Sequence, residues 1–250
     1  MKRLLAAGIL AGVAVGGTAA CTRETSGKTL TVFAAASLTE SFTQIGKDFE
    51  RSHRPWKVRL NLAGSAALAT QINNGAPADV FAAASAATMA AVVDAGNAIG
   101  TPVVIARNEL VIAVAPGNPK KIKTLADLRR PGLKVALCAV EVPCGAAAHK
   151  ALAAAKVALT PVTLETDVKA ALAKVKLGEV DAALVYRTDT LAAADKVDGV
   201  PFVGSAAAIN DYPTVVLKHA DEPAEAAVFV AYLQSGPGRD VLARAGFRTP

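Results

Sequence analysis

The chain has 250 residues, of which 52% are hydrophobic, 4% aromatic and 19% charged, and its formal net charge is +6 at pH 7. This length suffices for one large domain or two smaller ones, each with a hydrophobic core. The basic residues are scattered and the aromatic residues are few, which argues against the basic stripe with stacking aromatics that is typical of nucleic-acid binding. We expect a solvated, mildly basic surface and no nucleic-acid partner.

The first 20 residues have the three parts of an export signal. A basic start, "MKR", precedes the apolar run "LLAAGILAGVAVGG" and the small-residue stretch "TAAC", which ends at Cys21. The apolar run is glycine-rich and shorter than the roughly 20 residues of a spanning helix, which disfavours a transmembrane anchor. Small residues directly before a cysteine resemble a bacterial lipoprotein signal. We therefore predict a signal peptide at residues 1–20 and a lipid on Cys21, with simple secretion as the alternative.

Beyond the signal, strand-like apolar runs alternate with helical patterns. The run "LTVFAAA" precedes a predicted helix at residues 38–49, with Phe42, Ile45 and Phe49 on one face. The later predicted strands are "KVRLNLAG", "ADVFAAAS", "LVIAVAP", "LKVALC", "TPVTLET" and "DAALVYRTD", and the later predicted helices lie at 66–72, around Met89 and Val93, in "TLADL", at 145–155 and at 168–177. Near-continuous apolar strands between helices favour an α/β fold with parallel sheets covered on both faces. Periodicity leaves open one long domain or two lobes.

The cysteines suggest one internal pair. Three cysteines in an exported protein leave one without a partner. If Cys21 carries a lipid, Cys138 and Cys144 remain in "LCAVEVPCG", and an oxidising compartment permits a disulfide between them. Two buried free thiols are the alternative. The spacing fits neither a CxxC redox motif nor a zinc site, and the three histidines lie far apart, so we predict no bound metal cation.

Few residues suggest catalysis. The sequence contains no HExxH, GxGxxG, Walker A or GxSxG motif, and "GPGRD" at 236–240 is only a glycine-rich turn. Asp79 and Asp181 stand at strand entrances, where structural hydrogen bonding is usual. Glu165 and Asp167 precede a helix, which predicts capping charges in its first turn. We therefore expect no enzyme, although a catalytic site assembled from distant residues stays open.

Four predicted helices begin directly after strands, at Ser37, Ser65, Gly145 and Val168. Each start taken singly is more typical of a helix cap, and "SLTE" fits a capping box in which Glu40 returns to the Ser37 amide. Together they indicate something more, because helix N-termini offer unpaired N–H donors and positive partial charge. Ligands of open α/β sheets bind beyond the carboxyl ends of the strands. Anion binding is therefore a hypothesis that the residue pattern supports.

Four motifs carry a resemblance to a known family. At "LTVFAAASLTESF", "LAGSAALATQINNGAPADVFAAAS", "VPCGAAAHKAL" and "DVKAALAKVKLGEVDAALVY" the chain resembles the molybdate-binding proteins of ABC importers, in one order along the whole mature chain. The resemblance implies a two-lobed, periplasmic-binding-protein-like fold of type II, each lobe a mixed sheet flanked by helices. Two crossovers near Val111 and Asn210 would form the hinge. Lobe 1 would comprise 28–110 plus 211–250, and lobe 2 would be the insertion 111–210.

The same resemblance implies a set of anion ligands. Ser37 and Ser65 would bind through hydroxyl and backbone N–H groups, Cys144 and Val168 through backbone N–H groups, and Tyr186 through its phenol. Two features depart from the family pattern: "GSAA" keeps only one of its consecutive serines, and Cys144 replaces a small residue such as alanine. A disulfide would keep Cys144 neutral, whereas a thiolate would repel an anion.

The implied function is capture of molybdate or tungstate between the lobes and delivery to an ABC permease with its ATPase subunit. Both anions are fully deprotonated tetrahedral dianions, so a site that offers only donors suits them. We expect no cofactor, a monomer, and an extracytoplasmic location with membrane attachment by the lipid alone. The alternatives are another oxyanion, such as sulfate, thiosulfate or phosphate, and an enzyme acting on a small anion, for which only Tyr186 and Cys144 of the expected ligands titrate.

Overall fold

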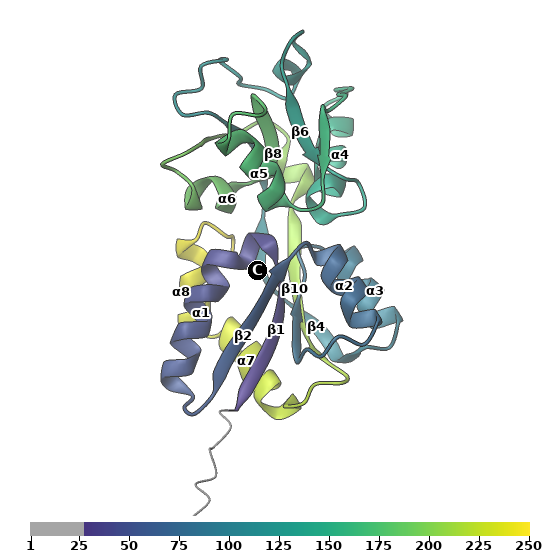
Figure 1. The fold of residues 1–250 in the computed structure, drawn as a ribbon, viewed down its shortest axis with the longest axis vertical. Helices are drawn as coiled ribbons and strands as arrows, with labels where there is room; N and C mark the ends of the chain where they lie inside the picture. The colour runs from purple at the N-terminus through teal and green to yellow at the C-terminus, as the bar shows by residue number, and fades with distance from the viewer. Residues whose placement is uncertain (1–27) are drawn as a thin grey trace, which may run out of the picture.

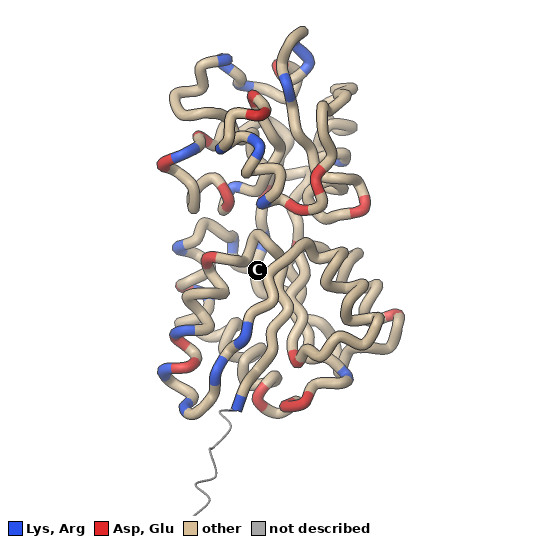
Figure 2. The backbone as a smooth tube through the Cα atoms, viewed as in Figure 1, with Lys and Arg blue, Asp and Glu red and all other residues tan. Residues whose placement is uncertain are grey.

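The computed structural model describes residues 28–250, so the predicted signal peptide and Cys21 lie outside the described residues. Figure 1 shows two bodies stacked along the long axis of the molecule, each with its own sheet. Among the described helices, none has the length and apolar character needed to cross a membrane. Basic and acidic residues are distributed over both bodies (Figure 2).

The first sheet has the strand order β2-β1-β3-β10-β4. Its strands are β1 (Thr29–Ala35), β2 (Lys57–Ala63), β3 (Val80–Ala82), β4 (Ala98–Asn108) and β10 (Asn210–Leu217), and its helices are α1 (Thr39–Ser52), α2 (Ser65–Asn73), α3 (Ala86–Asp94), α7 (Pro223–Gln234) and α8 (Gly236–Arg244). Strand β1 runs parallel to β2 and β3, whereas β10 runs antiparallel to β3 and β4.

Successive residues of β1 point to opposite faces of this sheet and enter two different cores. Val32 packs in the core under α1, α7 and α8, and Phe33 packs in the core under α2 and α3. Helices therefore cover both faces, as Figure 1 shows. Burial on both faces explains why β1 and β3 are apolar along most of their length, whereas the edge strand β2 has a polar residue at every second position.

The second sheet has the order β7-β6-β8-β5-β9 and one continuous core. Its strands are β5 (Leu110–Val114), β6 (Val135–Cys138), β7 (Thr163–Glu165), β8 (Ala182–Tyr186) and β9 (Asp198–Val200), its helices are α4 (Pro143–Ala154), α5 (Val168–Lys176) and α6 (Arg187–Ala192), and short 3-10 helices are η1 (Ala36–Leu38), η2 (Ala126–Arg129) and η3 (Ser205–Ala208). Strand β6 is parallel to β7 and β8, and β5 is antiparallel to β8 and β9.

Two neighbouring segments connect the bodies. Strand β4 ends at Asn108 and β5 begins at Leu110, so a single residue, Glu109, separates the two sheets. The chain returns through η3 into β10, whose first residue, Asn210, pairs with Asn108. The Asn108 amide also donates to Thr188 Oγ1 at 2.8 Å, which ties the end of β4 to α6.

The two-lobed α/β fold class with mixed sheets is confirmed, but the residue pattern alone predicted parallel sheets. That expectation is wrong for β4, β5, β9 and β10. A strand buried on both faces is apolar whichever way it runs, so composition does not reveal its direction. The "GPGRD" segment is also not an isolated turn, because Gly236 starts α8 with a proline in the first turn, where no N–H donor is needed.

Candidate functional site

The site lies where strand ends of the two sheets face each other. Strands β1, β2 and β3 end toward the second body, and β6, β7 and β8 end toward the first (Figure 1). A small pocket between them is lined by Ala35, Ala36, Ser37, Gly64, Ser65, Ala84, Val142, Pro143, Cys144, Asp167, Val168 and Tyr186. The structure thus brings together all five residues that were expected to bind the anion. Their role as ligands stays a prediction.

The size and composition of the pocket limit what can occupy it. The centre of a water molecule can move within about 20 Å³ of it. One bound water needs roughly 10–15 Å³ on this measure, so the space suits a small ion rather than an organic molecule. No Lys, Arg or His is among the described residues that line it. Attraction for an anion must therefore come from neutral donors.

Three helices start at the pocket. Helix α2 begins at Ser65, α4 at Pro143 and α5 at Val168, and the first N–H groups of a helix have no partner within it. Aligned peptide dipoles add positive partial charge at these ends. In α5, the Asp167 carboxylate accepts from the amides of Lys169 and Ala170 at 2.8 and 3.0 Å, which leaves the Val168 N–H for a ligand.

Asp167 therefore caps α5 as predicted, but Glu165 does not. Glu165 is the last residue of β7, and its carboxylate accepts from the Thr163 hydroxyl at 2.8 Å. The structural roles expected of two other carboxylates are confirmed. Asp79 accepts from the Thr31 amide at 2.7 Å, and Asp181 accepts from the Lys134 amide at 2.8 Å.

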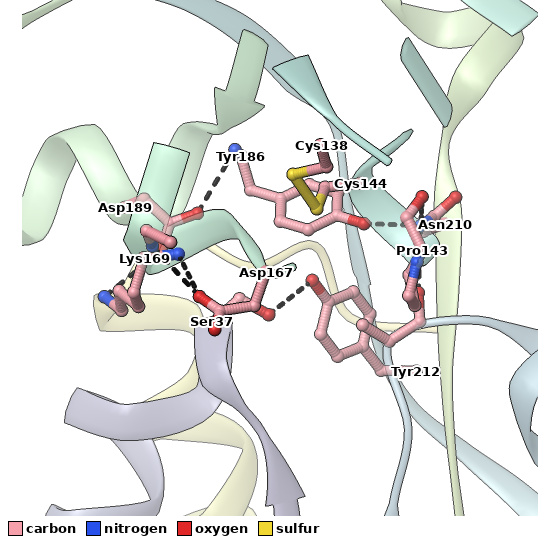
Figure 3. Close-up of a disulfide and its surroundings, with 12 residues drawn as sticks. Ser37, Cys138, Pro143, Cys144, Asp167, Lys169, Tyr186, Asp189, Asn210 and Tyr212 are labelled. Atoms are coloured by element: carbon pink, nitrogen blue, oxygen red, sulfur yellow. Dashed lines mark hydrogen bonds and ion pairs between the residues drawn. A yellow bond between two sulfur atoms is a disulfide. The ribbon is translucent and has the colours of Figure 1, made fainter. Parts of the chain in front are cut away.

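The capping box predicted for Ser37 is wrong. Helix α1 begins at Thr39, preceded by the 3-10 turn η1, so Ser37 and Glu40 do not occupy the positions that a capping box requires. The Ser37 hydroxyl instead lies 2.8 Å from the Tyr212 hydroxyl. In Figure 3 the two side chains meet at the edge of the site. Ser37 is thus a buried polar group of the site and not a helix cap.

Ser65 and Tyr186 both have a hydrogen left to donate. Ser65 Oγ accepts from the Ala84 amide at 3.0 Å, and the Tyr186 phenol oxygen accepts from Asn210 Nδ2 at 2.6 Å (Figure 3). Each hydroxyl can therefore give its own hydrogen to a ligand. Burial raises the pKa of Tyr186 well above its usual value, so this phenol stays protonated.

Asn210 and Tyr212 are site residues that the sequence prediction missed. Asn210 Nδ2 also lies 2.9 Å from the Ala84 carbonyl oxygen and 3.4 Å from that of Pro143, so its amide contacts both bodies. Tyr212 is fully buried and packs edge-on against Tyr186, with ring centroids 6.0 Å apart. The signal in the sequence is "NDY", a polar group at the start of an otherwise apolar strand, at the expected crossover.

A cluster of three charged residues spans the two bodies beside the pocket. Lys169 Nζ lies 2.9 Å from both carboxylate oxygens of Glu40, which belongs to α1, and 3.1 Å from Asp189 Oδ1, which belongs to α6. Burial raises the pKa of Asp189 to about 6, although Lys169 opposes the shift. Burial also disfavours the charged form of Lys169, but Asp189 and Glu40 outweigh it and its pKa is raised. No local sequence pattern connects these three residues.

The predicted disulfide joins Cys138, at the end of β6, to Cys144, in the first turn of α4. Both residues are buried, and the alternative of two free thiols is wrong. The next residue, Gly145, packs so closely that a Cβ atom there would lie 1.8 Å from the Ala139 carbonyl oxygen. The disulfide and this close contact fix the start of α4. No cluster of His, Cys, Asp or Glu suited to a metal ion occurs within residues 28–250.

Comparison with known proteins identifies the family. Residues 30–248 match the family model described as bacterial extracellular solute-binding protein. The chain belongs to this family. The molybdate-binding protein ModA of Mycobacterium tuberculosis is 45% identical over 223 residues, covering 89% of this chain and 85% of the relative. ModA of Escherichia coli is 31% identical over 229 residues, covering 87% and 88%. These similarities confirm the resemblance seen in the motifs.

Solved structures share the fold. The periplasmic molybdate-binding protein of Azotobacter vinelandii superposes with a TM-score of 0.76 at 20% identity, covering 88% of this chain and 99% of that one. The sulfate-binding protein SubI of Mycobacterium tuberculosis superposes with a TM-score of 0.79, also at 20% identity, covering 89% and 87%.

Proposed function

We propose that this protein captures molybdate, and also tungstate, in the pocket between its two bodies and delivers the anion to an ABC permease and its ATPase subunit. One observation carries the proposal. Donors expected to bind an oxyanion converge on one small pocket from both sheets, and none of residues 28–250 contributes a cationic side chain to its lining. The curated relatives named ModA support molybdate as the ligand.

The chemistry of the donors matches that of the ligand. Molybdate and tungstate are dianions with four oxygens and no proton near neutral pH, so every contact with them can be a donated hydrogen bond. Ser37, Ser65 and Tyr186 supply hydroxyl groups, and Cys144 and Val168 supply backbone N–H groups. A hydrogen bond to a charged group contributes roughly 1.5–3 kcal/mol, so five of them support tight binding without a salt bridge.

Sulfate is the second candidate because its oxygens also need only donors, and SubI shares the fold. Selection between sulfate and molybdate would then depend on the size of the pocket when the bodies close. Hydrogen phosphate is less well matched, since it keeps a proton that needs an acceptor. The one carboxylate in the lining, that of Asp167, already accepts two amides of α5.

The remaining parts of the proposal concern organisation and location. The lobes are 28–110 plus 211–250 and 111–210, and they close about the two crossovers as a hinge. The mature protein begins at Cys21, carries a lipid there and works as a monomer outside the cytoplasmic membrane. It performs no catalysis, since its task is to bind the anion and release it.

Isothermal titration of the mature protein with molybdate, tungstate, sulfate and phosphate tests the ligand. We expect binding of the first two and weak or no binding of phosphate. Absence of heat with both molybdate and tungstate would rule the proposal out, and stronger binding of sulfate would favour the second candidate. A double variant, Ser37→Ala with Ser65→Ala, should lose far more binding free energy for molybdate than free energy of unfolding. This result would separate a ligand role from a structural one.

A further inference from the structure

Six basic residues lie in the C-terminal half of α1, in the turn that follows it, at the start of β2 and directly before β1. This basic patch consists of Lys28, Lys47, Arg51, Arg54, Lys57 and Arg59. All six residues are exposed, and Figure 2 shows basic residues at the C-terminal end of α1, along β2 and at the start of β1. Most of them line an open hollow in which the centre of a water molecule can move within about 640 Å³. The patch lies at the opposite end of β1 from the anion site.

The net charge of the patch equals the charge excess of the described chain. Residues 28–250 contain 24 Lys and Arg against 20 Asp and Glu. Six of the basic residues belong to the patch, and Asp48 and Glu50 are the acidic residues among them. The remaining described residues therefore contain 18 of each sign. A second basic cluster at 120–134 is balanced by acidic residues elsewhere, so net charge alone does not single out either cluster.

Most of the patch charge is not neutralised locally. Within residues 28–250, only Arg51 and Lys57 of the six pair with a carboxylate, those of Asp48 and Glu50 respectively. Lys28 instead lies over the Trp56 ring, with Nζ 5.2 Å from its centroid, a cation–π contact that leaves the ammonium charged. Four cations are thus available to an anionic partner.

The path of the chain indicates which partner this is. The Lys28 carbonyl oxygen accepts from the Lys57 amide at 2.8 Å, so the described chain begins within the patch. Cys21 stands seven residues earlier, and seven residues span at most about 25 Å. A lipid on Cys21 would therefore hold the patch near the bilayer surface, where charges interact over a Debye length of about 8–10 Å.

We propose that the basic patch orients the lipid-anchored protein on an anionic phospholipid surface, with the C-terminal end of α1 toward the membrane and the anion site away from it. This inference rests on the lipid anchor in the proposed function. The lipid retains the protein at the membrane, and the patch sets its orientation there. The cluster at 120–134 lacks such a tether and has no comparable role.

Vesicle binding without the lipid measures the electrostatic contribution alone. The mature chain, residues 21–250, carrying Cys21→Ser is mixed with vesicles of phosphatidylcholine or of phosphatidylcholine with about 30 mol % phosphatidylglycerol, and bound protein is measured by sedimentation. We expect binding to the anionic vesicles only, and its loss as salt rises to about 0.5 M, where the Debye length is only several ångströms. Equal binding to both vesicles, or binding to neither at low salt, would overturn the inference.

Two triple variants with the same charge change locate the effect. Lys28→Gln, Lys47→Gln and Arg54→Gln remove patch charges, whereas Lys121→Gln, Lys123→Gln and Arg129→Gln remove exposed charges of the other cluster. Each basic residue near an anionic membrane strengthens binding about 5-fold, so the patch variant should bind on the order of 100-fold more weakly. The control variant should stay within about 3-fold of the parent protein, because its charges do not face the membrane. Equal losses in both variants would overturn the inference.

Orientation is read from Trp56, the single tryptophan of the chain. In the lipidated protein on anionic vesicles, energy transfer from Trp56 to a dansyl group on lipid head groups should be strong. It should fall in the patch variant, although the lipid still holds that variant on the vesicle. Unchanged transfer would contradict the inference. Molybdate titration of the same variant should match the parent protein, so a failure of the proposed function is seen separately.

Discussion

The Tyr186 hydroxyl provides the sharpest test of the anion site. Its oxygen accepts from Asn210 at 2.6 Å and its pKa is raised by burial, so its hydrogen is available to the bound anion. Replacing Tyr186 with Phe removes one charge-assisted hydrogen bond, worth roughly 1.5–3 kcal/mol. The dissociation constant for molybdate should therefore rise about 10- to 150-fold.

The fold should tolerate this change. Tyr186 is only 1% exposed, and Phe retains its packed ring. Asn210 keeps an acceptor in the Ala84 carbonyl oxygen at 2.9 Å, so no buried donor loses its last partner. The free energy of unfolding should fall by about 1 kcal/mol, the usual contribution of one hydrogen bond. Isothermal titration and urea unfolding measure the two quantities independently.

Tyr212→Phe is the matched control. It removes the same atom from a phenol that is equally buried but bonds to Ser37 rather than lining the pocket. Its affinity loss should stay below about 5-fold, since it disturbs only the orientation of the Ser37 hydroxyl. A molybdate affinity for Tyr186→Phe within about 3-fold of the wild type, or equal losses in the two variants, would refute the assignment of Tyr186 as a donor.

Three further predictions concern pH, closure and the disulfide. The folded pKa of Asp189, about 6, exceeds its ordinary 3.8, so the stability linked to this group is fully present below about pH 4 and is lost as the pH rises through 6. In the parent protein the free energy of unfolding should fall by about 3 kcal/mol across this pH range, as measured by urea unfolding, and Asp189→Asn should remove that fall. If the variant shows the same pH dependence of stability as the parent protein, Asp189 is not the group responsible. Gly64 has φ −56° and ψ 130°, which alanine tolerates, but its Cβ would lie 2.8 Å from the Thr166 carbonyl oxygen of the other body. Gly64→Ala should therefore push the two bodies apart and weaken molybdate binding about 10-fold or more, and unchanged affinity would show that binding does not need the two bodies this close together. Replacing Cys138 and Cys144 together with alanine should lower the free energy of unfolding by about 2 kcal/mol, the closure entropy of so short a loop, with molybdate affinity held within a few-fold because Cys144 is expected to bind through its backbone. A large loss of affinity in that variant at unchanged stability would contradict a backbone role.

Much of the fold could be predicted from local patterns. Apolar runs and helix periodicity located most strands and helices, because both signals are local and the central strands are buried on both faces. Strand direction was not predictable in this way, since the apolar residues of β3 and of the second half of β10 do not show which way either strand runs, and the two pair antiparallel only in the folded chain. The capping box at Ser37 failed for a related reason. A four-residue motif does not distinguish an α-helix start from a 3-10 turn that precedes it.

The site, like the fold, could be predicted only in part from the sequence. Helix starts after strands were visible in the sequence, and they converge on one pocket. The contacts that complete it join residues far apart in the chain, such as Ser37 with Tyr212 and Glu40 with Lys169. No local pattern predicts such pairs. The only local hint was the polar "NDY" at the start of β10, an unusual group beside a crossover.

The neutral lining of the pocket has a consequence for proton balance. Within the part of the chain that the structure describes, no His or Lys lines the pocket, the Tyr186 phenol stays protonated because its pKa is raised, and the Asp167 carboxylate accepts from amides of α5. An anion that is itself fully deprotonated can therefore enter and leave without a proton being taken up or released by the groups that line the pocket. Titration heats in buffers of different ionisation enthalpy should then coincide. At pH values above the range in which Asp189 titrates, a protein exposed to the changing acidity of its surroundings would hold its ligand equally well.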